Sequence, residues 1–241
     1  MYYVPTNLFG TENAKTVKGS KKGYTTYISY LAPFTQNSKG INLCAHASKG
    51  CAEACLFGAG RGAFTNVEVA RINKTEYFLA DRAKYLNQID KELARAVKKH
   101  GKNNSNFAIR LNGTSDIRFE KFKIRDGKNI FQLYPNVQFY DYTKNIKMLL
   151  DNKHDNYHIT FSRSEDNAAN VATALKLGYN VAMVFEKLPE SYMGYKVIDG
   201  DESDLRFLDE KNVIVGLTYK KVRTKGFDQE KPLESGFVIR A

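Results

Sequence analysis

Short apolar segments alternate with helical patterns along most of this chain of 241 residues, and the alternation constrains its fold more than any other feature. Runs of β-branched and aromatic residues predict strands, whereas apolar residues repeated every three or four positions predict helices. Alternation of the two is typical of βα units around a mainly parallel sheet. Strands are expected at 25–30, 107–116, 137–144, 157–165, 180–187, 196–201 and 212–220, with FVIR (237–240) as a terminal strand. The prediction is an α/β fold, a partial (β/α) barrel of about six or seven mainly parallel strands.

Three helices are expected between these strands. One covers 66–80, and a second covers 82–99, where lysines in the last turn and Gly101 after it are typical of a helix end. A third covers 167–177 and ends before Gly178.

No linker or change in composition divides the chain, so residues 1–241 are expected to form one domain, with a cysteine-rich loop at about 40–62. The first 23 residues and the stretch 221–236 are expected to be irregular or to lie at an edge of the fold. The acidic run DGDESDLRFLD (199–209) lacks the full ligand pattern of a calcium loop and is interpreted as a solvated turn.

Polar side chains gather where the apolar part of four expected strands ends. They are Asn112, Thr114 and Asp116, then Asp141, Thr143 and Lys144, then Ser162, Arg163 and Glu165, and finally Glu186 and Lys187. Barrels of βα units and open parallel sheets both bind ligands at the C-terminal ends of their strands. Residues of this kind also cap helices and form turns, and that alternative is the stronger one for any single position. It is weaker for the whole set, because caps do not need Arg or Glu.

All three cysteines of the chain lie within twelve residues, as Cys44, Cys51 and Cys55 in the pattern C-x6-C-x3-C. The three cysteines could also be small, buried apolar side chains that are neighbours by chance, but such clustering by chance is improbable. A disulfide is disfavoured in a reducing compartment and would leave one thiol over. The segment therefore predicts a metal centre.

Thiolates are soft ligands that select zinc or an iron–sulfur cluster. A closed zinc site wants four protein ligands, and His46 is the one candidate nearby, although one residue from Cys44 is a short spacing. Three cysteines instead suit a [4Fe–4S] cluster that keeps one iron open to another ligand. Glycines around the cysteines allow the backbone to approach sulfur closely, at Gly40, Gly50, Gly58, Gly60 and Gly62. The cluster is the favoured interpretation, and zinc remains the alternative.

Lys and Arg exceed Asp and Glu, 37 to 26, which gives a formal net charge of +11. Such a surplus attracts polyanions, so DNA or RNA is a candidate partner. The basic residues cluster in three groups: Lys15, Lys18, Lys21 and Lys22; Arg118, Lys121, Lys123, Arg125 and Lys128; Lys220, Lys221, Arg223 and Lys225. Solvated lysines and buried aromatic residues are the plainer interpretation. No apolar stretch is long enough to span a membrane, and no secretory signal is evident, so a cytoplasmic location is expected.

A strand followed by a three-cysteine loop and then by βα units with polar strand ends is similar in architecture to the radical S-adenosylmethionine enzymes. This resemblance implies a partial barrel, a [4Fe–4S] cluster and S-adenosylmethionine at the open iron. The usual motif of those enzymes is C-x3-C-x2-C, and LNGTSD (111–116) stands where they place a Gly-Gly-Glu-like segment. Binding of S-adenosylmethionine therefore does not follow from the motif here.

A closer resemblance covers nearly the whole chain. The segments LCAHASKGCAEACLFGAGRG, ARINKTEYFLADR, RLNGTSDI, VQFYDYTK, YHITFSRSE and DGDESDLRFLD resemble the gene-product-88 family of bacteriophages and other mobile elements. This resemblance implies a mobile-element context, hence the host cytoplasm, and supplies no reaction.

Three functions follow from these observations. The first is an iron–sulfur enzyme with catalytic residues Asn112, Asp116, Asp141, Arg163 and Glu165, and with Asn112, Thr114, Ser162 and Glu186 binding a cofactor. Arg163 would bind an anionic group, and a carboxyl whose pKa is raised by burial would act as general acid or base. The second is a nucleic-acid-binding protein with a structural metal. The third is a binder of a small molecule or host protein without turnover.

Overall fold

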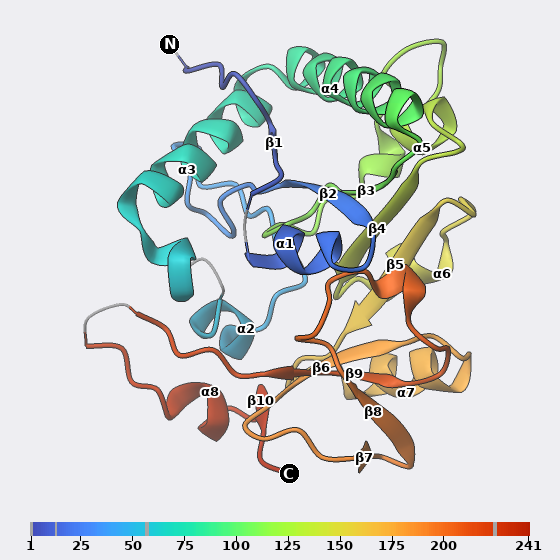
Figure 1. Cartoon of the computed structure of the whole chain (residues 1–241). Coiled ribbons are helices and arrows are strands. Elements are labelled where there is room, and N and C mark those ends of the chain that lie inside the picture. Colours follow the sequence, from blue (N-terminus) through green and yellow to red (C-terminus); the bar gives the residue numbers. More distant parts are fainter. Residues whose placement is uncertain (1, 13, 56–57, 224–225) are drawn as a thin grey trace. The chain divides into compact units, whose positions relative to one another are not determined.

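The computed structural model describes residues 2–12, 14–55, 58–223 and 226–241. Its contacts divide the chain into two compact units, between which the chain passes back and forth (Figure 1). The first unit comprises residues 1–44, 68–141 and 152–158, and the second comprises 45–67, 142–151 and 159–241. The prediction of a single domain stays a prediction, and the units are described separately below.

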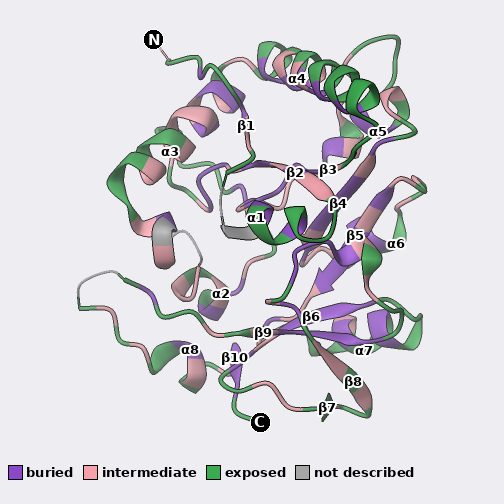
Figure 2. Cartoon of the chain, in the orientation of Figure 1, coloured by how far each residue is buried: buried purple, intermediate pink, exposed green. Residues whose placement is uncertain are grey.

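The first unit is built on four neighbouring strands in the order β1-β2-β3-β4. Strand β1 (Phe9–Gly10) is antiparallel to β2 (Tyr24–Ser29), whereas β2, β3 (Asn106–Arg110) and β4 (Gln138–Thr143) run parallel. Most residues of β3 and β4 and half of those of β2 are buried, as expected of parallel strands, whereas both residues of β1 are partly exposed (Figure 2).

Helices α3 (Thr65–Ala80) and α4 (Arg82–Asn103) supply much of the first unit's remaining core. Helix α4 buries an apolar stripe repeated every three or four residues, namely Leu86, Ile89, Leu93 and Ala96. It contacts the strands through Tyr85, whose hydroxyl lies 3.1 Å from Ser29 Oγ, and through His100, whose ring centre lies 4.6 Å from that of Phe107. Shorter elements complete this unit: α1 (Ala14–Ser20), the 3-10 turn η2 (Phe119–Lys121) and α5 (Ile130–Leu133).

The second unit has its strands in the order β5-β6-β9-β8-β7, and β10 pairs with β6; Tyr157 and His158, the first two residues of β5, belong to the first unit. Strands β5 (Tyr157–Ser162), β6 (Val181–Phe185), β9 (Ile214–Thr218), β8 (Tyr195–Asp199) and β10 (Val238–Ile239) are parallel to their partners in this unit. The exception is β7 (Ser191–Tyr192), which is antiparallel to β8. Its helical elements are α2 (Lys49–Glu53), η1 (Gly60–Ala63), α6 (Ile146–Leu150), α7 (Ala168–Lys176), η3 (Arg206–Leu208) and α8 (Lys231–Glu234).

The mixed α/β class and the mainly parallel strands are therefore as predicted, but the described residues form ten strands, and neither unit closes its described strands into a barrel. The extra strands β1 and β7 contain two residues each, which is too short for a periodic pattern. Observed strands also end earlier than expected: β3 stops at Arg110, so Asn112, Thr114 and Asp116 follow the strand. None of the described helices combines the length and apolar character that a membrane crossing requires.

Two other expectations were wrong. Helix α1 lies within the first 23 residues and helix α8 within 221–236, both expected to be irregular or edge structure; the edge strand β1 does fit that expectation. The run 199–209 is not a solvated turn throughout, because Ser203, Asp204 and Arg206 are buried within it. The Arg206 guanidinium is held by Asp209, whose carboxylate lies 3.2 Å from Nε, and it donates to the Ser203 carbonyl. Paired in this way, a charged side chain tolerates burial.

Candidate functional site

Cys44, in the first unit, lies against the polar segment that follows β3. Its backbone N–H donates to Asn42 Oδ1 at 2.8 Å, and its Sγ lies 3.6 Å from the Thr114 carbonyl oxygen. The Asp116 N–H donates to the Leu43 carbonyl at 2.9 Å. The structure thus brings one predicted metal ligand together with two predicted site residues, through backbone contacts that fix the sulfur's surroundings.

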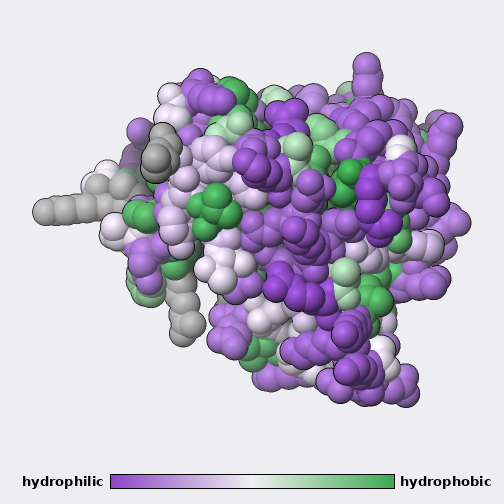
Figure 3. Space-filling model, turned by 90° about the horizontal axis from the view of Figure 1, so that it is seen from above, coloured by the Kyte–Doolittle hydropathy of each residue, from purple (hydrophilic) through white to green (hydrophobic). Residues whose placement is uncertain are grey.

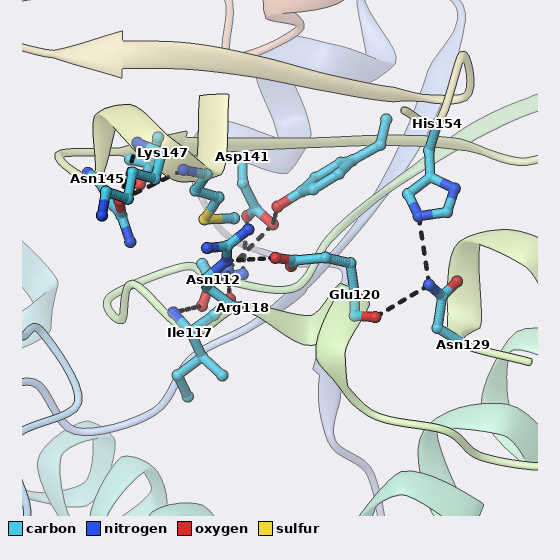
Figure 4. A network of polar contacts seen from close by, with 12 residues as sticks. Asn112, Ile117, Arg118, Glu120, Asn129, Asp141, Asn145, Lys147 and His154 are labelled. Carbon is cyan, nitrogen blue, oxygen red and sulfur yellow. Dashed lines mark hydrogen bonds and ion pairs between the residues drawn. The ribbon is translucent and has the colours of Figure 1, made fainter. Parts of the chain in front are cut away.

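The segment 112–117 is in turn held by a buried carboxylate, Asp141 on β4. Asp141 Oδ1 accepts from the Asn112 backbone N–H at 2.8 Å, and Oδ2 accepts from the Asn112 amide at 3.3 Å and from the Tyr157 hydroxyl at 3.0 Å. Asn112 Oδ1 accepts from the hydroxyl of Ser115 and from the N–H of Ile117, both at 2.9 Å. Figure 4 shows Asp141 and Asn112 pointing toward each other. The carboxylate therefore shapes the loop on which Cys44 rests.

Burial raises the pKa of Asp141 from 3.8 to about 7. The Arg110 guanidinium, whose Nε lies 3.9 Å from Asp141 Oδ1, opposes this rise in pKa, and so do the hydrogen bonds from Asn112 and Tyr157. Desolvation of the charged form outweighs them. Its partner Tyr157 has a pKa raised well above 10, through burial and the nearby carboxylate. A carboxyl that titrates near neutrality is suited to proton transfer.

A second polar group lies around the short turn η2 in the first unit. Arg118 forms an ion pair with Glu120, and the Asn129 amide donates to the Glu120 carbonyl at 3.1 Å and lies 3.3 Å from His154 Nε2 (Figure 4). Burial is the largest cause that lowers the pKa of His154. These contacts join backbone and side chains locally, and we assign them a structural role.

In the second unit, Glu165 holds the N-terminus of α2, the helix that carries Cys51. Glu165 Oε2 accepts from the Ser48 hydroxyl at 2.6 Å, and Oε1 accepts from the Gly50 N–H at 2.7 Å. Ser48 Oγ accepts from the Cys51 N–H at 3.1 Å. A carboxylate at this position satisfies helix donors that would otherwise be unpaired. Both oxygens of Glu165 are thus engaged in positioning the cysteine loop.

Gly50 packs where no side chain fits. A Cβ at this position would lie 2.6 Å from Phe237 Cβ and 2.7 Å from Ser235 Oγ. The sequence suggested that glycines here bring backbone close to sulfur; at Gly50 the close approach is instead to residues 235–237 and Glu165. On the other side of the loop, the Arg223 N–H donates to the Gly58 carbonyl at 2.8 Å, and Ala59 pairs with Val222.

Cys51 and Cys55 lie between these two anchors. All three cysteines of the chain are half-buried, and no disulfide joins them. Cys44 belongs to the first unit, whereas Cys51 and Cys55 belong to the second, in which His46 is exposed. In the part of the chain that the structure describes, no three Cys, His, Asp or Glu side chains already form a metal-binding group.

The remaining predicted residues lie in the second unit. The Arg163 guanidinium donates to the carbonyls of Gly236 and Phe237 at 2.6 and 2.9 Å, and desolvation lowers its pKa. Ser162 Oγ accepts from Lys144 Nζ at 3.1 Å. Glu186 is exposed and lies 4.0 Å from Arg240. Arg163 and Glu165 thus both brace the contact between the cysteine loop and residues 235–237.

Sequence reasoning missed Arg110, Tyr157 and Ser48. A charged residue at the end of the apolar run FAIR was a signal for Arg110, because a buried guanidinium needs a partner. Ser48 stands three residues before Cys51, the spacing of an N-cap. Tyr157 carries no such signal, because its role depends on a partner sixteen residues away.

Replacing Glu165 with Ala is expected to loosen α2. The Gly50 N–H and the Ser48 hydroxyl lose their acceptor, a change that costs about 1–3 kcal/mol of stability for a buried donor. Backbone amides of residues 48–55 should then exchange with deuterium faster, as measured by mass spectrometry. Glu186→Ala is the matched control, since this carboxylate is exposed and its ion pair is with Arg240. Equal exchange in the two variants would contradict the role of Glu165.

Comparison with known proteins gives one result. No curated protein and no solved structure matches the chain. A family model described as gene product 88 matches residues 7–240, which is nearly the full length. The sequence resemblance is thereby confirmed at the level of the family. The chain belongs to the gene product 88 family.

Proposed function

We propose that this protein is an iron–sulfur protein in which Cys44, Cys51 and Cys55 hold a [4Fe–4S] cluster. The observation that carries the proposal is that Cys51 and Cys55, both half-buried, lie in a segment anchored on either side by contacts of its own chain. A loop held in this way keeps ligands in place at a low entropic cost.

The residues present fit such a group. Thiolates are the standard ligands of iron–sulfur clusters, and three of them leave one iron open. The dense packing of Gly50 against residues 235–237 gives the loop a rigid base. Neither the Glu165 contacts nor the Arg223 contact involves a cysteine side chain, so metal binding would not break them.

We further propose that the protein is an enzyme, with an architecture like that of the radical S-adenosylmethionine family. When bound, the cluster would supply Lewis-acid or one-electron chemistry at its open iron. Asp141, with a pKa of about 7, holds or releases a proton at Oδ near neutral pH. Asn112 fixes the orientation of that carboxyl and of the segment 112–117. S-adenosylmethionine is one candidate ligand for the open iron, supported by the architectural resemblance and not by the cysteine motif.

Visible and electron paramagnetic resonance spectra of anaerobically purified protein test this proposal. We expect sulfide-to-iron charge-transfer absorption in the wild type and its complete loss in the triple Cys→Ala variant. Adding S-adenosylmethionine to the reduced protein should change the resonance spectrum, because a ligand at the open iron alters its electronic structure. A colourless wild type would overturn the cluster, and an unchanged spectrum would overturn the cofactor assignment alone.

A further inference from the structure

The structure distinguishes the three basic groups of the sequence, because two of them have carboxylates beside them. In the group at 118–128, Arg118 pairs with Glu120, and Arg125 lies 2.9 Å from Asp90 and 3.4 Å from Asp126. In the group at 220–225, Lys220 lies 2.7 Å from Asp201. Nearby carboxylates reduce the attraction of both groups for a polyanion.

The first group differs, because the fold brings two of its lysines to the same edge of the first unit as three lysines of α4. Lys21 and Lys22 lie in the turn before β2, and this strand pairs with β3 from its first residue, Tyr24 opposite Asn106. Helix α4 leads into β3, so its last lysines reach the same edge of the first unit. We call this surface the basic edge, and it consists of Lys21, Lys22, Lys98, Lys99 and Lys102, all exposed.

Acidic residues are absent from both segments that form the basic edge. No Asp or Glu occurs between Glu12 and Glu53, or between Glu92 and Asp116. Lysines in the last turn of a helix also stabilise its dipole, which accounts for part of the α4 cluster. That effect does not explain Lys21 and Lys22, which lie outside any helix, or the absence of Asp and Glu from the sequence on either side of them.

The basic edge offers charge without stacking surfaces. His100 is buried there, its ring nitrogens lie within 3.0 Å of Tyr27 and Ser105, and burial lowers its pKa. Of the described aromatic side chains, only Tyr3, Phe64 and Tyr179 are exposed, and none belongs to the edge. Single-strand binders rely on exposed aromatic residues, whereas duplex binding can rest on phosphate contacts. Hydrophilic side chains also cover much of the face in Figure 3.

We infer that the basic edge binds the phosphate backbone of duplex nucleic acid without reading its sequence. Each lysine that contacts a phosphate displaces a condensed counterion, so binding should weaken steeply as salt is added. The inference is independent of the cluster, because no residue of the edge lies near a cysteine in the sequence. It predicts that the triple Cys→Ala variant keeps the same affinity.

The test measures fluorescence anisotropy of a labelled DNA duplex, titrated with full-length protein at salt concentrations from about 50 to 200 mM. The variant Lys21→Gln, Lys98→Gln, Lys102→Gln should bind at least ~10-fold more weakly than wild type. Its slope of log affinity against log salt should be smaller by about 2 to 3, at about 0.9 per phosphate contact. The matched control changes the same number of lysines in the group with carboxylates: Lys121→Gln, Lys123→Gln, Lys128→Gln.

Affinity close to wild type in the control, together with the loss in the edge variant, would support the inference. Equal weakening of both variants would overturn it, since net charge alone would then explain binding. Failure of the wild type to bind at the lowest salt would also overturn it. So would tighter binding to single-stranded DNA than to the duplex, or binding only to vesicles of anionic phospholipid.

Discussion

Replacing Asp141 with Asn is expected to remove a pH dependence of stability that the wild-type protein shows between about pH 4 and pH 7. Burial raises the pKa of this carboxyl from 3.8 to about 7, so the folded protein binds a proton that the unfolded chain releases. The stabilisation is fully present below pH 3.8 and is lost as the pH rises through about 7. A shift of this size corresponds to about 4 kcal/mol.

Urea denaturation across this pH range measures the effect. The free energy of unfolding of the wild type, minus that of Asp141→Asn, should fall as pH rises to about 7 and then level off. Asp126→Asn is the control, because this carboxylate is 73% exposed and should leave the pH dependence unchanged. A difference that stays flat, or that rises with pH, would contradict a buried carboxyl with a raised pKa.

Replacing Gly50 with Val is expected to displace the cysteine loop and to abolish metal retention. The added Cβ would overlap Phe237 Cβ, an atom fixed by its own backbone, so relief requires movement of a chain segment. Overpacking of this kind costs about 1–3 kcal/mol, and the γ-methyl groups of Val add to it. Because Gly50 adjoins Cys51, the displacement should also shift the thiol that follows.

Gly101→Ala is the matched control for this variant. A Cβ at Gly101 meets no atom within 4 Å, and Ala favours a helix interior over Gly by about 1 kcal/mol. The control should therefore keep its metal and unfold at the same or a higher urea concentration. Full metal retention and unchanged stability in Gly50→Val would show that the loop does not depend on this contact.

The periodic segments of the sequence predicted most of the helices and strands. The points at which helices end and the burial of charged residues depend on local conformation and on partners in space, and these were harder to predict. Gly178 ends α7 in a left-handed conformation, as expected. Gly101, in contrast, lies inside α4. The helix ends at its C-cap, Asn104, which has a φ of 44°, a left-handed conformation that Asn adopts more easily than most residues. The buried Arg206 was missed because a charged run looks solvated until its partners in space are known.

The residues of the candidate site were likewise predicted only in part. Polar residues after strand ends do cluster, but sequence position does not reveal what each one contacts. Arg163 and Glu165 were expected to face a substrate, and in the structure both bind the chain itself. Asp141 has the raised pKa expected of an acid or base, because its surroundings exclude water, a property set by residues far away in sequence. The catalytic roles of Arg163, Glu165 and Asp141 stay predictions.

The metal content of anaerobically purified wild-type protein, measured with its acid-labile sulfide, tests the central proposal most directly. Ligation by Cys44, Cys51 and Cys55 predicts about four irons and four sulfides per chain, and none in the triple Cys→Ala variant. One zinc per chain without sulfide, or iron that persists when all three cysteines are replaced, would contradict it.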